Sequence, residues 1–384
     1  ERLPAKCPRL LLRGSPSEEP EMPTEIRAAV LHAPHEPIRI ERLILDDPDA
    51  DEVLIEIRAA GLCHSDLHYI EGHIGGTFPM VLGHEAAGVV VKVGDKVTGL
   101  KPGDHVIPLF SPECRQCVNC LSGRTNFCLK PATVPGRSRM KTLDGQPVYR
   151  ASLGITATHA VLSEHAVCKI RDDAPFDKVF YCGCGITTGV GAAMFQAKVK
   201  RDDRVIVFGV GGIGLNVLQG ARLAGAKQIV AVDANPLREE SALKFGATHF
   251  VNVHDHGDKI VEHLQQITGG GAEYCFECIG NVEVMRQALA ATNPYWGRAI
   301  VVGIAPAGKQ VSFDAISLIL GRGISGSVFG GAKGKTDLPK VVDWYMNGDI
   351  MVDELVTHTM KLEDINEGYD LMRRGESIRT AIVL

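Results

Sequence analysis

Four cysteines lie close together in one stretch of the sequence, where they could bind a metal ion. They are Cys114, Cys117, Cys120 and Cys128, in the pattern C-x₂-C-x₂-C-x₇-C. Four thiolates on one loop make a closed tetrahedral site suited to zinc, with no position left for a substrate. The cluster therefore predicts a structural zinc ion. An iron–sulfur cluster, which uses the same ligands, is the alternative, whereas a disulfide framework is typical of much smaller secreted domains.

A second set of metal ligands would have to come from distant parts of the chain. Cys63 opens the segment 63–68, His84 follows Gly83, and Cys184 stands between two glycines. Three ligands of this kind leave the fourth position open for water or an alcohol. Zinc there would lower the pKa of a bound hydroxyl and prepare its carbon to donate a hydride. Spacing alone does not bring the three together, and each residue taken singly is also typical of a buried cysteine or a surface histidine.

A glycine-rich turn at residues 209–214 matches the pattern G-x-G-x-x-G. It directly follows an apolar run at 205–208 and precedes a helical pattern, which is the context of a dinucleotide-binding turn. The glycines would allow the tight turn and the close approach of a pyrophosphate, and the helix N-terminus would attract the phosphates. The residues expected to bind the cofactor here are Gly209, Gly211, Gly212, Ile213 and Gly214. A glycine-rich turn without a nucleotide is the alternative.

An acidic residue follows at the position that selects the cofactor. Asp233 ends the next apolar run, nineteen residues after Gly214. Its carboxylate would accept hydrogen bonds from both hydroxyls of the adenosine ribose and would repel a 2′-phosphate. The sequence therefore favours NAD over NADP.

Composition and patterning indicate which elements must position these residues. The chain has 384 residues, a formal charge of −5 and 45% hydrophobic residues, which suits two ordinary domains. No basic stripe suggests nucleic acid or an anionic membrane as a partner, and no apolar run approaches the roughly 18 residues needed to cross a bilayer. Short strands and turns up to about residue 180 predict a barrel-like β domain. After Gly185, apolar runs alternate with helix-length segments, which predicts a doubly wound α/β domain.

Taken together, these motifs resemble those of the zinc-containing medium-chain alcohol dehydrogenases, and above all their class III (glutathione-dependent formaldehyde dehydrogenase) branch. The resemblance covers nearly all of residues 24–384, and it also rests on the segments 183–189, 276–281, 329–331 and 377–380. It implies a GroES-like barrel catalytic domain and a Rossmann doubly wound cofactor domain. It also implies NAD and two zinc ions per chain, one catalytic and one structural.

The resemblance implies the roles of single residues around the catalytic zinc. The ligands would be Cys63, His84 and Cys184. Glu85 aligns with an acid that can approach the metal, and Asp66 with the carboxylate that orients the histidine ligand. Cys182 is a second candidate for the third thiolate, but only Cys184 stands in the glycine–cysteine–glycine context of the family.

Further roles concern the proton and the cofactor. Ser65 aligns with the hydroxyl that takes the alcohol proton, and His68 with the outer end of the proton relay. By the same resemblance, His64 and Arg379 contact the pyrophosphate, Arg238 lies near the adenosine, and Thr188 lies beside the nicotinamide.

The family divides its barrel domain around the cofactor domain. We therefore expect a catalytic domain at 22–185, a cofactor domain at 186–328, and a return to the catalytic domain at 329–384. Residues 1–21 are interpreted as an extension or a cloning remnant, with a weak targeting peptide as the alternative. The family forms dimers or tetramers by joining cofactor domains. The thiol-rich metal sites, together with the lack of a targeting signal, favour the cytoplasm.

Three features depart from the class III pattern. Ala132 stands where an arginine of that branch recognises the glutathione adduct, the loop at 72–77 contains no acidic residue, and His68 replaces a tyrosine. Because a zwitterionic tripeptide would lose its charged partners, we expect reversible oxidation of primary or aromatic alcohols to aldehydes with NAD.

S-(hydroxymethyl)glutathione (thiol-dependent formaldehyde) dehydrogenase is the alternative, for which Arg137, Arg139 or Lys141 could supply the missing charge. A zinc-stabilised binding protein without chemistry is disfavoured, because every catalytic position is filled.

Overall fold

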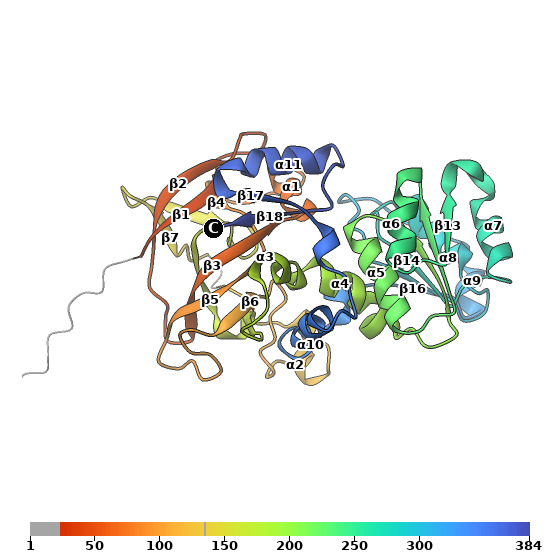
Figure 1. Cartoon of the computed structure of the whole chain (residues 1–384), viewed down its shortest axis with the longest axis horizontal. Coiled ribbons are helices and arrows are strands. Elements are labelled where there is room, and N and C mark those ends of the chain that lie inside the picture. The colour runs from red at the N-terminus through yellow and green to blue at the C-terminus, as the bar shows by residue number, and fades with distance from the viewer. Residues whose placement is uncertain (1–23, 134–135) are drawn as a thin grey trace, which may run out of the picture.

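The computed structural model describes residues 24–133 and 136–384, so the predicted extension at 1–21 lies outside the described residues. In Figure 1, antiparallel strands fill one side of the molecule and a parallel sheet with its helices fills the other, with α4 (Gly185–Gly191) and α10 (Gly334–Met346) between them. This arrangement confirms the predicted pairing of a GroES-like barrel with a Rossmann-type sheet.

The β part consists of a closed barrel and a seven-stranded sheet. The barrel follows the order β1 (Thr24–Leu31), β2 (Arg39–Leu45), β7 (Met140–Thr142), β8 (Pro147–Arg150) and β4 (Met80–Val81). The sheet follows the order β10 (Val167–Lys169), β6 (His105–Pro108), β5 (Glu85–Val93), β3 (Glu52–Leu62), β18 (Arg379–Val383) and β17 (Val356–Lys361), and β9 (His159–Ser163) also pairs with β3.

The last strand of the chain lies against the strand that leads into the first candidate metal ligand. β18 runs antiparallel to β3, with Thr380 opposite Leu62. Arg379, the first residue of β18, is thereby held close to Cys63 even though more than 300 residues separate them in the sequence.

The α/β part is built on a six-stranded parallel sheet. Its order is β13 (His249–Asn252), β12 (Gln228–Asp233), β11 (Arg204–Phe208), β14 (Tyr274–Glu277), β15 (Arg298–Val301) and β16 (Gly323–Gly326). The apolar run at 205–208 is fully buried in the central strand β11, as expected for a strand covered on both faces. The sheet therefore confirms the predicted doubly wound architecture.

The remaining helices cover these sheets or join them. They are α1 (His64–Ile70), α2 (Val118–Leu121), α3 (Phe176–Val179), α5 (Gly212–Leu223), α6 (Glu239–Lys244), α7 (Ile260–Ile267), α8 (Val282–Ala291), α9 (Ile316–Ile319) and α11 (Ile365–Arg373). Among the residues the structure describes, no helix combines the length and apolarity that a bilayer crossing requires. α11 buries Ile365, Tyr369 and Met372 along one face, as their helical spacing predicts.

The glycine-rich turn joins β11 directly to α5. Gly209 has a φ of +87°, a left-handed conformation that favours glycine. A Cβ atom at Gly214 would lie 1.8 Å from the carbonyl oxygen of Gly209, whereas a Cβ atom at Gly211 would have no atom within 4 Å. The strand and helix can therefore approach this closely only with glycine at 214, while position 211 faces open space.

We expect Gly214→Ala to destabilise the protein by about 3 kcal/mol, because the added methyl group forces the helix away from the strand. Gly211→Ala is the matched control and should change the free energy of unfolding by less than about 1 kcal/mol. Urea unfolding of both variants measures the difference. Equal stability of the two variants would contradict the close packing at position 214.

Candidate metal centres and cofactor site

The structure brings four potential ligands together at the ends of three elements. The ligand atoms of Cys63, His84, Glu85 and Cys184 all lie within 4.8 Å of one another. Cys63 follows the end of β3, His84 precedes β5, Glu85 begins β5, and Cys184 precedes α4. The first three are buried. Two thiols and an imidazole in this arrangement match the ligand chemistry of a catalytic zinc site.

Asp66 holds the histidine of this cluster in one orientation. Its Oδ1 lies 3.4 Å from Nδ1 of His84, and its two oxygens accept hydrogen bonds from the backbone N–H groups of Cys63 and Gly83, each at 3.3 Å. Asp66 is itself only 1% exposed. Because Nδ1 of His84 is engaged by a carboxylate, Nε2 is the nitrogen left to bind a metal.

The pKa shifts within the cluster indicate that its side chains could bind a cation. A hydrogen bond from Cys184 holds the pKa of Cys63 well below its usual value, and the same contact together with burial raises the pKa of Cys184. Burial raises the pKa of Glu85 to about 8, and neither of its carboxylate oxygens has a hydrogen-bond partner among the described residues. Buried acceptors without donors are costly, so the donor set fits a zinc ion.

Arg379 supplies the nearest permanent positive charge. Its Nη1 lies 3.4 Å from Oε1 of Glu85, and it also donates to the carbonyl oxygen of Leu62. The guanidinium carbon lies 4.2 Å from the ring centre of Tyr181. Burial alone would lower the pKa of Arg379, but the charge of Glu85 keeps it above its usual value. Arg379 therefore carries its charge in the interior, beside the candidate metal site.

The four-cysteine loop forms a separate group. The sulfur atoms of Cys114 and Cys120 lie 3.8 Å apart and those of Cys117 and Cys128 lie 4.0 Å apart. All four sulfur atoms lie within 4.8 Å of one another. The backbone N–H groups of Leu129 and Cys120 donate to Cys117 and lower the pKa of its thiol to about 6. Amide donors of this kind stabilise thiolates, and four protein ligands fit a structural zinc.

The glycine-rich turn and Asp233 form the candidate cofactor site. The N–H of Val210 donates to Oδ2 of Asp233 at 2.7 Å, and the N–H of Asn235 donates to Oδ1 at 2.9 Å. These bonds fix the carboxylate at the C-terminal end of β12, beside the turn that begins α5. Arg238 ends the short 3₁₀ helix η5 (Pro236–Arg238), five residues further along the chain.

The proton-relay candidates lie on α1. Oγ of Ser65 is 3.7 Å from Sγ of Cys63, which places the hydroxyl beside the metal cluster. Nδ1 of His68 lies 3.4 Å from Nδ1 of His73, in the loop that follows the helix. His64, the first residue of α1, is exposed. The roles predicted for these residues, and for Thr188 in α4, stay predictions.

Sequence reasoning missed three aromatic residues around the cluster. The ring of Phe110 packs edge-on against the rings of His84 and Phe329. Its centre lies 5.8 Å from the centre of the His84 ring and 5.1 Å from that of the Phe329 ring. Tyr181 stacks under Arg379. Two of them offered a signal in the sequence: Phe110 lies two residues after β6 and shortly before the cysteine loop, and Phe329 begins the segment 329–331, on which the resemblance partly rests. Tyr181 belongs to no motif.

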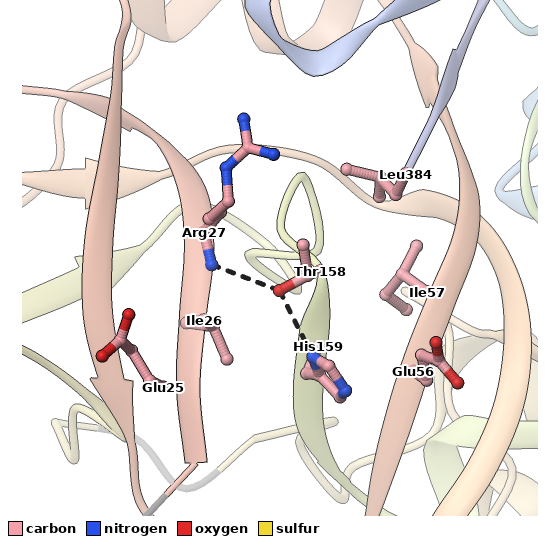
Figure 2. A pocket seen from close by; sticks show the side chains of 8 residues that line it. All are labelled: Glu25, Ile26, Arg27, Glu56, Ile57, Thr158, His159 and Leu384. Atoms are coloured by element: carbon pink, nitrogen blue, oxygen red, sulfur yellow. Dashed lines mark hydrogen bonds between the residues drawn. The ribbon is translucent and has the colours of Figure 1, made fainter.

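A hollow in the surface of the barrel lies apart from these sites. Figure 2 shows its lining, which includes Arg27, Thr158, His159 and the terminal Leu384, and its volume is about 350 Å³. It contains none of the predicted site residues. Arg27 pairs with Glu363 outside the hollow, so its charge is already compensated.

Two family models match the chain. The model described as "Alcohol dehydrogenase GroES-like domain" matches residues 49–172, and the model described as "Zinc-binding dehydrogenase" matches residues 212–347. The first match spans the cluster ligands Cys63, His84 and Glu85 as well as the four-cysteine loop. The second begins inside the glycine-rich turn.

Whole-length relatives carry related names. The chain is 49% identical over 372 residues to a Cereibacter sphaeroides protein named "Alcohol dehydrogenase class-3", covering 93% of this chain and 99% of that protein. It is 48% identical, with the same coverage, to "S-(hydroxymethyl)glutathione dehydrogenase" of Paracoccus denitrificans. The crystal structure of benzyl alcohol dehydrogenase from Acinetobacter calcoaceticus superposes with a TM-score of 0.87 at 30% identity, covering 94% of this chain and 99% of that one.

We expect Cys63→Ser to abolish turnover and to lower the zinc content from about two ions per chain to about one, while NADH still binds. Cys182→Ser is the matched control, because Cys182 is a fully buried cysteine that does not belong to the cluster. Atomic absorption and NADH fluorescence measure the two properties. A Cys182→Ser variant that loses zinc while Cys63→Ser retains it would overturn the ligand assignment.

Proposed function

The chain belongs to the zinc-containing medium-chain alcohol dehydrogenases, and we propose that its substrate is the hydroxymethyl adduct that formaldehyde forms with a thiol such as glutathione. The observation that carries this choice is the 44–49% identity, over 93% of the chain, to relatives named class-3 alcohol dehydrogenase or S-(hydroxymethyl)glutathione dehydrogenase. The choice reverses the expectation from the sequence, in which free primary or aromatic alcohols come first.

The reaction removes a hydride and a proton from a –CH₂OH group. The hydride passes to NAD and gives NADH, the carbon becomes a thioester carbonyl, and the hydroxyl proton is released. Zinc bound by Cys63, His84 and Cys184 would supply Lewis acidity that lowers the pKa of the substrate hydroxyl. The hydroxyl of Ser65, 3.7 Å from Sγ of Cys63, would accept the released proton and pass it outward.

The chain's own residues also orient the reactants. Asp66 fixes His84 through Nδ1, and the open space beside Gly211 at the start of α5 gives a pyrophosphate access to backbone N–H groups. Asp233, already anchored by two backbone N–H groups, would receive the adenosine ribose. These positions support transfer of the hydride to NAD.

Free primary or aromatic alcohols are the second candidate. This reading is favoured because three basic side chains that could have bound glutathione already form ion pairs within the protein. Arg137 and Arg139 both pair with Asp49, and Lys141 pairs with Asp46 at 2.9 Å. These three residues were the possible replacements for the arginine missing at Ala132. Their charges are compensated within the protein, which leaves fewer partners for the carboxylates of glutathione.

The test is NADH production by the pure protein with formaldehyde, with formaldehyde plus glutathione, and with benzyl alcohol. Turnover that appears with formaldehyde only when the thiol is added supports the proposed substrate. Thiol-independent oxidation of benzyl alcohol at a higher kcat/KM would overturn the proposal in favour of the second candidate. Inactivity with every substrate at full zinc content would contradict both.

We also propose that two copies associate through the α/β part. β16 ends the parallel sheet, and within residues 24–133 and 136–384 no further strand pairs with its outer edge. Unpaired edges can pair with a second chain. Large apolar side chains are exposed in the segments next to β15 and β16. They are Tyr295, Trp296, Ile316, Leu318, Ile319, Leu320 and Val328. Several large exposed apolar side chains close together in the sequence are typical of an interface.

The domain division at 22–185, 186–328 and 329–384 is likewise a proposal. It is supported by the pairing of β18 with β3, which joins the end of the chain to the catalytic part. A cytoplasmic location is proposed because both metal sites need reduced thiolates, which a reducing compartment maintains.

We expect Asp233→Ala to shift the preference for NAD over NADP by at least tenfold, about 1.4 kcal/mol, because the repulsion of the 2′-phosphate is lost. The ratio of kcat/KM for the two cofactors measures the change. Gly211→Ala should weaken both cofactors alike and is the control. An unchanged ratio in Asp233→Ala would refute the proposed contact with the ribose.

A further inference from the structure

Tyr181 is a fully buried tyrosine whose surroundings differ from those of an ordinary core residue. It lies in the short 3₁₀ helix η3 (Phe180–Gly183), which leads into the ligand Cys184. The side chain is 0% exposed, and its hydroxyl lies near Arg379 without a well-formed hydrogen bond to any described residue. A buried hydroxyl without a well-formed hydrogen bond costs free energy, so the presence of tyrosine here calls for an explanation from its ring.

Tyr181 contacts three groups of the candidate site, which are Arg379 and the first residues of α4 and α5. Its centre lies 4.2 Å from the guanidinium carbon of Arg379. A Cβ atom at Gly185, the first residue of α4, would lie 2.0 Å from the ring, and a Cβ atom at Gly212, the first residue of α5, would lie 2.7 Å from its hydroxyl oxygen. The tyrosine therefore packs directly against the starts of both helices and under the arginine.

Arg379 has few other contacts that could hold its guanidinium in place. It donates to the carbonyl of Leu62 and lies 3.4 Å from Glu85, an acid that is also within reach of the metal ligands. Because Glu85 could bind the metal instead, its contact with Arg379 is not constant. The aromatic face, in contrast, is fixed by two helices and attracts the cation whatever the state of Glu85.

We propose that Tyr181 is a positioning residue for the cofactor. Its ring holds Arg379 beside the first turn of α5, so that the guanidinium meets the pyrophosphate of NAD without first having to be ordered. This inference rests on the proposed role of Arg379 in binding NAD. It assigns the effect to the ring, which lies 4.2 Å from the guanidinium carbon, rather than to the hydroxyl, which forms no well-formed hydrogen bond.

The test is the dissociation constant of NADH, measured by fluorescence on the zinc-loaded protein. Tyr181→Leu should raise this constant about tenfold, the size expected for loss of a desolvated cation–π contact. Tyr181→Phe keeps the ring and should stay within about twofold of the wild type. Steady-state kinetics should show a raised KM for NAD in Tyr181→Leu and a nearly normal KM in Tyr181→Phe.

Two further variants separate positioning from simple loss of packing. Tyr369→Leu is the matched control, because Tyr369 is a buried tyrosine with an unpartnered hydroxyl in another core cluster. It should lower the melting temperature as Tyr181→Leu does, yet leave NADH affinity unchanged. Combining Tyr181→Leu with Arg379→Leu should weaken NADH binding no more than Arg379→Leu alone, because the tyrosine acts through the arginine.

Normal NADH affinity in Tyr181→Leu, or an equal loss in Tyr369→Leu, would overturn the inference. A loss in Tyr181→Phe as large as in Tyr181→Leu would also overturn it, because the hydroxyl would then carry the effect. Failure of the wild-type protein to bind NADH would instead contradict the proposed function itself, so the two failures are distinguishable.

Discussion

The structure depends on gathering acidic ligand groups in a largely buried place. Two thiols and the carboxylate of Glu85 lie within 4.8 Å of one another and of His84, and ionised groups so close together repel strongly at low dielectric. A divalent cation bound between these groups would cancel the repulsion, and its attraction to them would stabilise the fold. The neighbouring elements serve this requirement: Asp66 orients the imidazole from α1, and Arg379 balances the carboxylate from β18.

The positive charge beside Glu85 comes from the last strand of the chain, which joins the β part. β18 inserts beside β3 and delivers Arg379 to the interior, where it contacts Glu85 on one side and Tyr181 on the other. The same arginine thus lies between Glu85 of the candidate metal cluster and Tyr181, whose hydroxyl lies beside the first residue of α5. Because glycines at 185 and 212 leave room for the tyrosine ring at the starts of the two helices, Tyr181 contacts elements of both the candidate metal cluster and the candidate cofactor site.

The choice of substrate depends on residues other than the metal cluster, Arg379 and Tyr181. The catalytic cluster requires only a hydroxyl on a carbon that can lose a hydride, which thiol adducts and free alcohols both provide. What distinguishes them is that only the glutathione adduct carries ionised groups that need charged partners on the protein. The loop at 72–77 contains no acid, and the basic residues that could have compensated for Ala132 are paired with Asp46 and Asp49. Identity to the relatives and local charge therefore favour different substrates.

The sequence by itself determined what depends on neighbours along the chain. The four-cysteine loop, the glycine turn at 209–214 and the acid at Asp233 were predictable because each is a local geometry that only certain residue types can adopt. The buried strands of the parallel sheet were predictable for the same reason, since their apolar runs are continuous.

Only the tertiary structure decided contacts between distant segments. It placed the sulfur of Cys184 in the cluster and that of Cys182 in the core, where the sequence favoured Cys184 only through its resemblance to the family. It also paired Arg379 with Glu85 and Tyr181, and Arg139 with Asp49. Spacing along the sequence contains no trace of these pairs, because strand pairing and packing between distant segments bring them together.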